Sequence, residues 1–165
     1  MSLSFRRASP ADLPRLMQMF SEGQQQLLSL GAFQWQEGVY PNEQIVLDDI
    51  AEQVCFVACE GGAVVGTLVI DPRPEPYFAQ PQLRWRYPAQ SSLVLHRLAV
   101  AKSARGRKVA RALLQFAAKK GPHLRLDTSP QNLPMVHLAE SEGFVKVGTL
   151  IYSDYGGIIC DCYEK

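Results

Sequence analysis

The sequence predicts an α/β fold: one domain with a mixed, mostly antiparallel sheet of about seven strands, flanked by about four helices. Three observations predict it. Segments with the apolar spacing of strands and of helices follow one another along the chain. The length of 165 residues is enough for one domain with a continuous core. No internal repeat or low-complexity tract appears, so residues 1–165 are interpreted as a single domain.

The first half of the chain predicts a strand, two helices and a β-hairpin. Ser9, Pro10 and Asp12 supply an N-cap, a first-turn proline and a third-position acid, which together begin a helix. Gly31 ends its run of helically spaced apolar residues. Residues 60–62 (EGG) form the turn of the hairpin. The predicted elements are a strand over 4–8, helices over 9–31 and 43–52, and the hairpin strands 54–59 and 63–71.

The second half of the chain predicts strands alternating with helices after a long loop. Residues 71–90 contain five prolines, and a loop of this length indicates a functional or interaction role. The apolar stretch SLVLHRLAV that follows is typical of a buried strand. The predicted elements are a strand over 92–100, a helix over 106–120, a strand over 123–127, a helix over 130–141, and an antiparallel pair over 144–152 and 158–163.

The composition predicts a globular protein of the cytoplasm. The chain is 47% hydrophobic and 20% charged, and no apolar stretch is long enough to span a membrane, so no membrane partner is expected. The N-terminus MSLSFRRASP lacks the apolar core of a secretory signal. Cys55, Cys59, Cys160 and Cys162 have no nearby histidine and match no zinc spacing. They are expected to be reduced structural thiols, and no metal is expected.

Basic residues are concentrated in one part of the chain. Residues 77–126 contain no Asp or Glu, while the rest of the chain contains all 16 acidic residues. This segregation predicts an anionic ligand for one part and favours a cation at the other. A solvated basic surface is the alternative. The basic residues of this stretch are Arg84, Arg86, Arg97, Lys102, Arg105, Arg107, Lys108, Arg111, Lys119, Lys120 and Arg125.

Within this stretch, residues 103–114 (SARGRKVARALL) follow the strand 92–100 and begin a helix. A helix N-terminus offers unpaired N–H groups and a partial positive charge to an anion. Gly106 and Ala110 leave room for the backbone to approach a diphosphate, and the basic residues between 105 and 111 add charge. Neither a Walker A motif nor GxGxxG is present. The pattern alone leaves open an anion site or a basic surface helix.

The segment resembles the signature of the GCN5-related N-acetyltransferase (GNAT) superfamily, whose members acetylate amines with acetyl-CoA. The family signature is [Q/R]-x-x-G-x-[G/A], and this chain has RGRKVA, with Lys108 in place of the middle glycine. In the family, the loop amides hold the CoA pyrophosphate, and the end of the preceding strand binds the pantetheine arm and the acetyl carbonyl. The resemblance implies acetyl-CoA binding by Leu98, Ala99, Val100, Arg105, Gly106, Arg107, Lys108, Val109 and Ala110.

The resemblance extends to nearly the whole chain and implies a GNAT-like fold. Residues 4–20 match the opening strand and helix of the family, 60–70 match its hairpin, and 132–144 (NLPMVHLAESEGF) match a later motif. It implies that Asn132 contacts the pantetheine arm. Many members have a tyrosine four residues before the glycine of this motif, as the general acid for the departing thiolate. Ala139 stands there in this chain, so that role is vacant or filled elsewhere.

Acetyl transfer to an amine needs a neutral nucleophile, a polarised carbonyl and a proton for the thiolate. His96 is the leading base candidate, because simple strand alternation places it on one face with Leu98 and Val100 and its ordinary pKa suits the task. A structural histidine is the alternative. Glu75 on the proline-rich loop is a second candidate base or a solvated acid. Tyr152 near the final turn is a candidate proton donor to sulfur or a packing residue.

Aromatic residues in the two long loops are candidates for an acceptor pocket. With two acids they could wall a site for a cationic amine, and packing against the sheet is the alternative. The pairs Gln34-Trp35 and Tyr40-Pro41 resemble an uncharacterised bacterial subgroup of the family. The residues concerned are Trp35, Tyr40, Tyr77, Trp85, Glu37 and Glu43.

The sequence therefore predicts an acetyl-CoA-dependent N-acetyltransferase that transfers the acetyl group directly to a primary amine of a small molecule. A homodimer is compatible with it. The alternatives are a protein or peptide amine acetyltransferase and a non-catalytic CoA-binding module. Nucleic-acid binding ranks last, because the basic stretch is accompanied by neither an RNP-type strand nor a recognition-helix signature.

Overall fold

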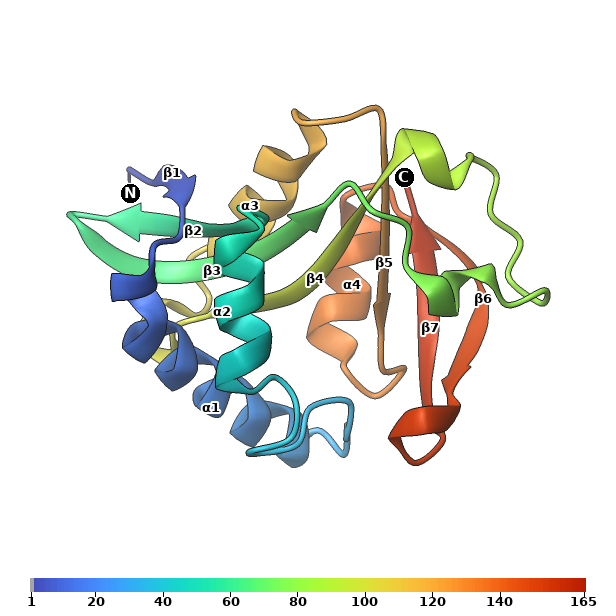
Figure 1. Ribbon diagram of the computed structural model, residues 1–165, viewed down its shortest axis with the longest axis horizontal. Coiled ribbons are helices and arrows are strands. Elements are labelled where there is room, and N and C mark those ends of the chain that lie inside the picture. The colour runs from blue at the N-terminus through green and yellow to red at the C-terminus, as the bar shows by residue number, and fades with distance from the viewer. Residues whose placement is uncertain (1) are drawn as a thin grey trace.

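A seven-stranded sheet forms the centre of the computed structural model, which describes residues 2–165, and helices cover both faces of the sheet (Figure 1). The predicted number of strands and helices is confirmed. The strands are β1 (Ser4–Arg7), β2 (Cys55–Glu60), β3 (Ala63–Asp71), β4 (Ser92–Val100), β5 (His123–Thr128), β6 (Val145–Tyr152) and β7 (Ile158–Glu164). The helices are α1 (Leu13–Ser29), α2 (Glu43–Ala51), α3 (Val109–Ala118) and α4 (Leu133–Ser141).

The order of strands creates a gap in the sheet. The order is β1-β2-β3-β4-β5-β7-β6, and β4 and β5 are the parallel neighbours in an otherwise antiparallel sheet. The two strands pair only near their starts, where Ser92–Val94 of β4 lies beside His123–Arg125 of β5. Beyond these residues β4 keeps its pairing with β3, and β5 keeps its pairing with β7. The carboxyl-terminal halves of β4 and β5 therefore diverge.

The predicted helix start at Ser9 begins a 3-10 turn, Pro10–Asp12, which leads directly into α1 at Leu13. Asp12 accepts a hydrogen bond from the Ser9 amide at 2.8 Å and a bidentate pair from Arg6, which holds the pKa of that carboxyl below its ordinary value. The apolar stripe of α1 packs into the core, and Trp35 stands edge-on to Phe20 with ring centroids 5.6 Å apart. Trp35 approaches α1 closely, because a Cβ on Gly23 would lie 2.8 Å from its ring.

Helix α3 packs directly on the opposite face of β3. A Cβ on Gly66 would lie 2.7 Å from a Val109 methyl group and 3.0 Å from a Leu113 methyl group. The absence of a side chain at Gly66 therefore lets the first turn of α3 rest on the sheet, in line with a central strand that helices cover on both faces. This contact places the N-terminus of α3 beside the gap between β4 and β5.

The proline-rich loop follows the exposed edge of β6 (Figure 1). The Gln80 side chain donates to the Ile151 carbonyl at 3.0 Å, and the Gln82 side chain donates to the Thr149 carbonyl at 3.1 Å. These contacts occupy backbone groups that an edge strand would otherwise leave open to another chain. The loop is thus ordered by the sheet, and it carries Glu75 to the gap.

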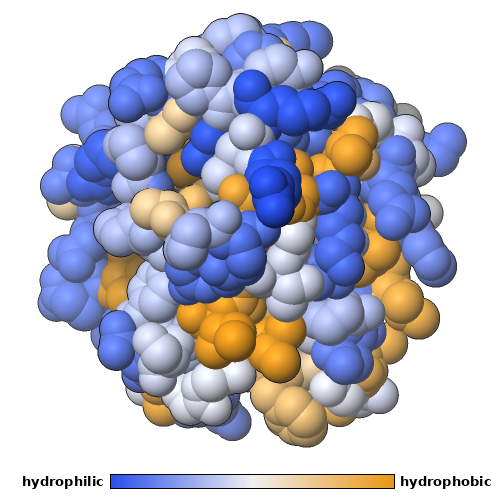
Figure 2. Space-filling view, turned by 90° about the vertical axis from the view of Figure 1, so that its right-hand side faces the viewer, coloured by the Kyte–Doolittle hydropathy of each residue, from blue (hydrophilic) through white to orange (hydrophobic). Residues whose placement is uncertain are grey.

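For Trp85 the structure favours the packing alternative. Its ring packs against Phe78, and the Arg125 guanidinium carbon lies 4.2 Å from the ring centre. Trp85 belongs to a second apolar cluster below the loop and lines no part of the cavity described next. Figure 2 shows the side of the molecule that carries β6, where apolar atoms lie among polar ones. Among residues 2–165, no helix is long and apolar enough to cross a membrane.

Candidate active site

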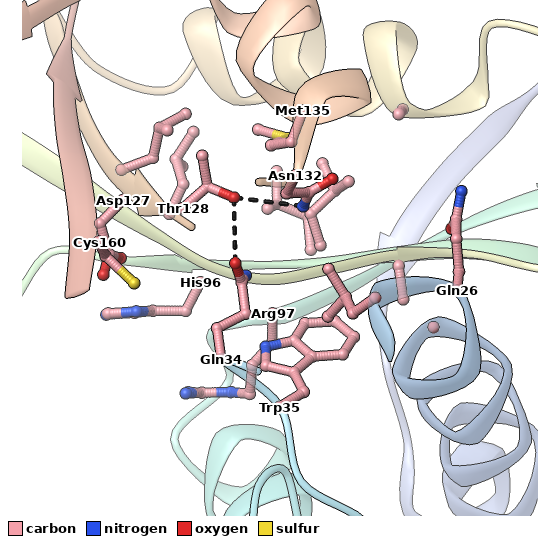
Figure 3. Close-up of a pocket in the computed structure, with 18 of the residues that line it drawn as sticks. Gln26, Gln34, Trp35, His96, Arg97, Asp127, Thr128, Asn132, Met135 and Cys160 are labelled. Atoms are coloured by element: carbon pink, nitrogen blue, oxygen red, sulfur yellow. Dashed lines mark hydrogen bonds between the residues drawn. The ribbon is translucent and has the colours of Figure 1, made fainter. Parts of the chain in front are cut away.

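A cavity of about 890 Å³ occupies the gap between β4 and β5. Its walls come from both faces of the sheet: α1 and the 31–41 loop on one side, and the starts of α3 and α4 on the other (Figure 3). The proline-rich loop and the β6–β7 turn close one end. The structure brings together all but one of the predicted site residues, namely Glu75, His96, Leu98, Ala99, Val100, Arg105, Gly106, Lys108, Val109, Ala110, Asn132 and Tyr152.

A β-bulge in β4 corrects the predicted face assignment. Arg97 has a left-handed backbone with φ 51°, and the pairing with β3 shifts by one residue beside it. His96 consequently pairs with Val69 and Ala99 pairs with Thr67. His96 therefore shares a face with Ala99, and the prediction that it shares one with Leu98 and Val100 is wrong. An extra residue in a strand reverses the alternation beyond it.

The bulge is held by a buried ion pair. The Arg97 guanidinium donates to both oxygens of Asp49 at 2.7 Å and to the Tyr40 hydroxyl at 2.6 Å. The Arg97 and Asp49 side chains are 11% and 10% exposed. A left-handed arginine costs about 1–2 kcal/mol, so these three hydrogen bonds fix a conformation that the strand alone would not adopt. Arg97 therefore lines the cavity as one half of an ion pair with Asp49.

The start of α3 carries unpaired amide groups. The backbone amides of Gly106, Arg107, Lys108, Ala110 and Arg111 have no hydrogen-bond partner within the described residues. Gly106 and Lys108 have φ values of 77° and 64°, so both take the left-handed conformation that glycine adopts without strain. Lys108 is the N-cap residue of α3, and its side chain is exposed. This geometry explains why a glycine suits this position, and it leaves the Lys108 amide free.

The basic side chains of this segment point in different directions. Arg105 lines the cavity and donates to the Glu22 carbonyl at 3.0 Å, and Arg111 lines the cavity near Glu142. Arg107 lies outside the cavity lining and donates to Glu60 on β2 at 2.6 Å. The prediction that the Arg107 side chain faces the ligand is therefore wrong, and only its backbone amide remains available.

A hydrogen-bonded chain crosses the gap to the start of α4 (Figure 3). Gln34 accepts from the Thr128 hydroxyl at 3.3 Å and from the Ser129 amide at 2.6 Å. Asn132 donates from its side chain to the same hydroxyl at 3.2 Å. These contacts hold the Asn132 side chain in the cavity, and its carbonyl oxygen accepts no hydrogen bond from the described residues. Ala139 on the same helix is fully buried away from the cavity.

Asp127, near the end of β5, lines the cavity and was not among the residues predicted from the sequence. The Tyr152 hydroxyl donates to its carboxylate at 2.5 Å. Burial raises the pKa of Asp127 to about 6, the hydrogen bond from Tyr152 opposes this rise, and the nearby Glu75 carboxylate adds to it. Burial and the charge of Asp127 raise the pKa of Tyr152 far above its ordinary value. The signal was an acid at the carboxyl end of a parallel strand, a position where ligands commonly bind.

His96 and Glu75 meet at the same end of the cavity, with His96 Nε2 3.8 Å from Glu75 Oε2. Burial, together with the charge of Arg97, lowers the pKa of His96 to about 3. The expectation of an ordinary histidine pKa is therefore wrong, and the imidazole is neutral at neutral pH. Neither ring nitrogen makes a hydrogen bond with the residues that the structure describes.

Tyrosines form an arc beside this pair. The Tyr77 ring lies 4.6 Å from the Tyr152 ring and 6.3 Å from the Tyr155 ring, and Tyr40 continues the arc 6.5 Å from Tyr155. The Tyr77 hydroxyl donates to Asp154 at 2.5 Å and so joins the proline-rich loop to the β6–β7 turn. Of the residues predicted to wall an acceptor pocket, Trp35, Tyr40 and Tyr77 line the cavity, and Trp85, Glu37 and Glu43 do not.

Comparison with known proteins identifies the family. The model of the acetyltransferase (GNAT) family matches residues 16–144. The chain belongs to this family. A GNAT-family acetyltransferase from Streptococcus agalactiae is 27% identical, with a TM-score of 0.88 over 99% of this chain and 94% of that one. The protein yncA from Salmonella typhimurium, solved with acetyl-CoA, is 15% identical, with a TM-score of 0.69 over 100% of this chain and 94% of that one.

A third similar structure is the ribosomal-protein-alanine N-acetyltransferase from Brucella melitensis, which is 22% identical, with a TM-score of 0.70 over 98% of both chains. No curated protein matched the chain. Acetyl-CoA is the acetyl donor of the family, and the cavity fits it. One end offers unpaired amides with Arg105 and Arg111 for phosphates. Among the described residues, no group of three His, Cys, Asp or Glu residues could hold a metal ion.

Proposed function

We propose that this protein is an N-acetyltransferase that moves the acetyl group of acetyl-CoA directly to a primary amine of a small molecule. One observation carries the proposal: a single cavity joins the unpaired amides of α3 to the carboxylate of Asp127. Donor and acceptor can therefore meet in one cavity. Such an arrangement supports direct transfer without a covalent intermediate on the protein.

We assign donor-binding roles to the predicted residues that line one half of the cavity. The amides of Gly106, Lys108 and Ala110 bind the pyrophosphate of CoA, and the Arg105 side chain adds charge. The backbone from Leu98 to Val100 and the side chain of Asn132 face the pantetheine arm. The bulge at Arg97 supports this role, because β4 has no strand partner on the side of the gap there.

We assign proton transfer in the acceptor half of the cavity to Asp127 and Tyr152. Acetyl-CoA supplies the thioester that the amine attacks. Asp127 accepts the proton of the attacking amine, because it is the cavity carboxylate whose pKa burial raises to about 6, close to neutral. The hydroxyl of Tyr152 orients this carboxylate and can pass the proton on to the departing sulfur. Tyr152 would then fill the role that Ala139 leaves vacant.

An assay of acetyl-CoA with a panel of amines tests this function. Release of free CoA thiol together with an acetylated small amine supports it. Preferential acetylation of a peptide amine favours the first alternative, a protein or peptide acetyltransferase. CoA binding by calorimetry without turnover of any amine favours the second, a CoA-binding module, which the buried Ala139 supports.

A further inference from the structure

The acceptor end of the cavity has a strongly negative character. Three carboxylates line it, from Glu75, Asp127 and Asp154. The basic side chain at this end is Arg97, which Asp49 neutralises, and the pKa of His96 keeps its imidazole uncharged. The basic residues lining the cavity, apart from Arg97, lie at the other end, around the start of α3. The acceptor end therefore favours a cation and disfavours an anion.

Two polar groups at this end lack partners. Glu75 Oε1 accepts from the Tyr77 amide at 3.1 Å, while Glu75 Oε2 accepts no hydrogen bond within residues 2–165. His96 makes none either, and the two side chains are only 21% and 14% exposed. Both groups therefore remain available to a ligand. A ligand N–H group placed between them would satisfy both, because a neutral imidazole nitrogen and a carboxylate oxygen both accept.

The tyrosine arc is a second, independent feature that suits a cation. Tyr40, Tyr77, Tyr152 and Tyr155 present rings around the same end of the cavity. Aromatic faces attract ammonium groups by about 0.5–2 kcal/mol, the more strongly the less water is present. Carboxylates and rings together form the surroundings in which organic cations commonly bind.

The reacting nitrogen cannot be the cation that these groups hold. It must lose its proton before it attacks, and carboxylates around it would stabilise its protonated form. One carboxylate, Asp127, suffices as the base of the proposed function. Glu75 and Asp154 remain, and Glu75 repels Asp127, because its proximity raises the pKa of Asp127. A second ammonium group that stays protonated would relieve this repulsion without hindering the reaction.

We propose that the acceptor is an aliphatic diamine or polyamine, whose distal ammonium lies between Glu75, His96 and the tyrosine arc. The inference rests on the proposed function, since it concerns the same acceptor site. Glu75 is accordingly a specificity residue for the distal cation, while Asp127 handles the proton of the reacting amine. The site discriminates against acceptors that carry a carboxylate in place of the distal ammonium.

A series of acceptors with the same five-carbon chain tests the proposal. The compounds 1,5-diaminopentane, pentylamine and 5-aminopentanoate share one reacting amine and end in an ammonium, a methyl group and a carboxylate. The value of kcat/KM should fall in that order, with about a tenfold or greater advantage of the diamine over pentylamine, the effect expected for one charged hydrogen bond. Equal values for the diamine and pentylamine, or a preference for the amino acid, would overturn the proposal.

Variants assign the preference to named residues. Glu75→Gln and Asp154→Asn should each bring the ratio of diamine to pentylamine closer to one. Asp48→Asn is the matched control, because it removes the same charge from an exposed site on α2 outside the cavity, and it should leave the ratio unchanged. A wild-type ratio in Glu75→Gln would contradict the assignment.

Binding separates this inference from the proposed function. Calorimetry of the three compounds with the CoA-saturated protein needs no turnover. Tighter binding of the diamine than of pentylamine, weakened by Glu75→Gln, would support the cation site even if no compound were acetylated. Acetylation of pentylamine with no tighter binding of the diamine would support the proposed function and refute the inference.

Discussion

The hydrogen bond between Tyr152 and Asp127 makes a quantitative prediction for the pH dependence of the enzyme. Burial raises the pKa of Asp127 from 3.8 to about 6, a destabilisation of the carboxylate by about 3 kcal/mol. The Tyr152 hydroxyl opposes this rise. A hydrogen bond to a charged group contributes about 1.5–3 kcal/mol, so its loss should raise the pKa of Asp127 by a further 1–2 units, approximately.

The assay is the pH profile of kcat/KM for the acceptor, measured from about pH 5 to about pH 9. The wild-type profile should show an acid limb near pH 6, the value to which burial raises the pKa of Asp127. In Tyr152→Phe the limb should move upward by about one unit or more, and in Asp127→Asn it should disappear. The turnover of both variants should also fall, and in Asp127→Asn, which lacks the general base, the fall should be about a hundredfold.

Tyr77→Phe is the matched control for this experiment. It removes a tyrosine hydroxyl that donates to a different carboxylate, Asp154, at the same distance of 2.5 Å. The acid limb of Tyr77→Phe should remain at the wild-type position. A limb that stays in place in Tyr152→Phe, or that persists in Asp127→Asn, would refute the assignment of Asp127 as the base.

Four further predictions concern binding and stability. Arg105→Glu should raise the Kd for CoA in calorimetry, while Arg107→Glu should change the Kd much less, because Glu60 holds the Arg107 side chain outside the cavity. Equal losses of CoA affinity in the two variants would contradict this geometry. Lys108→Gly should be more stable in urea unfolding than Lys108→Ala by about 1 kcal/mol, because both variants remove the charge but only glycine adopts a φ of 64° without strain. Equal stabilities would show that the backbone at residue 108 is not strained. Asp127→Asn should raise the free energy of unfolding by up to about 3 kcal/mol at pH 8. The pKa of Asp127 is higher in the folded than in the unfolded protein, so its carboxylate destabilises the fold only above about pH 4. A gain in stability that persists below this pH would contradict the prediction. Gly66→Ala should cost about 1–3 kcal/mol in urea unfolding, because its Cβ would lie 2.7 Å from Val109, and a neutral result would mean that α3 can move away.

Local signals explain how much of the fold the sequence could predict. The first helix, the hairpin and the helix that follows RGRK depend on caps, glycine turns and apolar spacing within a few residues of each other. The loop before α3 was predicted for the same reason. Its free amides follow from the helix N-terminus itself, whatever packs around it.

The parts that the sequence could not predict depend on distant partners. The bulge at Arg97 requires Asp49, far away on α2, and without it simple alternation gives the wrong face for His96. The direction of Arg107 is decided by Glu60 on the hairpin. Asp127 owes its raised pKa to burial in the fold, and its hydrogen-bond donor Tyr152 comes from β6, far along the chain. No spacing rule within one segment contains these contacts.

The stoichiometry of acetyl transfer tests the central claim most directly. Acetyl-CoA, the protein and 1,5-diaminopentane are incubated, and the acetylated amine is quantified by mass spectrometry beside the free CoA thiol. We predict one acetylated amine for each CoA released, and about a hundredfold slower formation of both in Asp127→Asn with the Kd for CoA unchanged. CoA release that is independent of the amine, or CoA binding with no product, would contradict it.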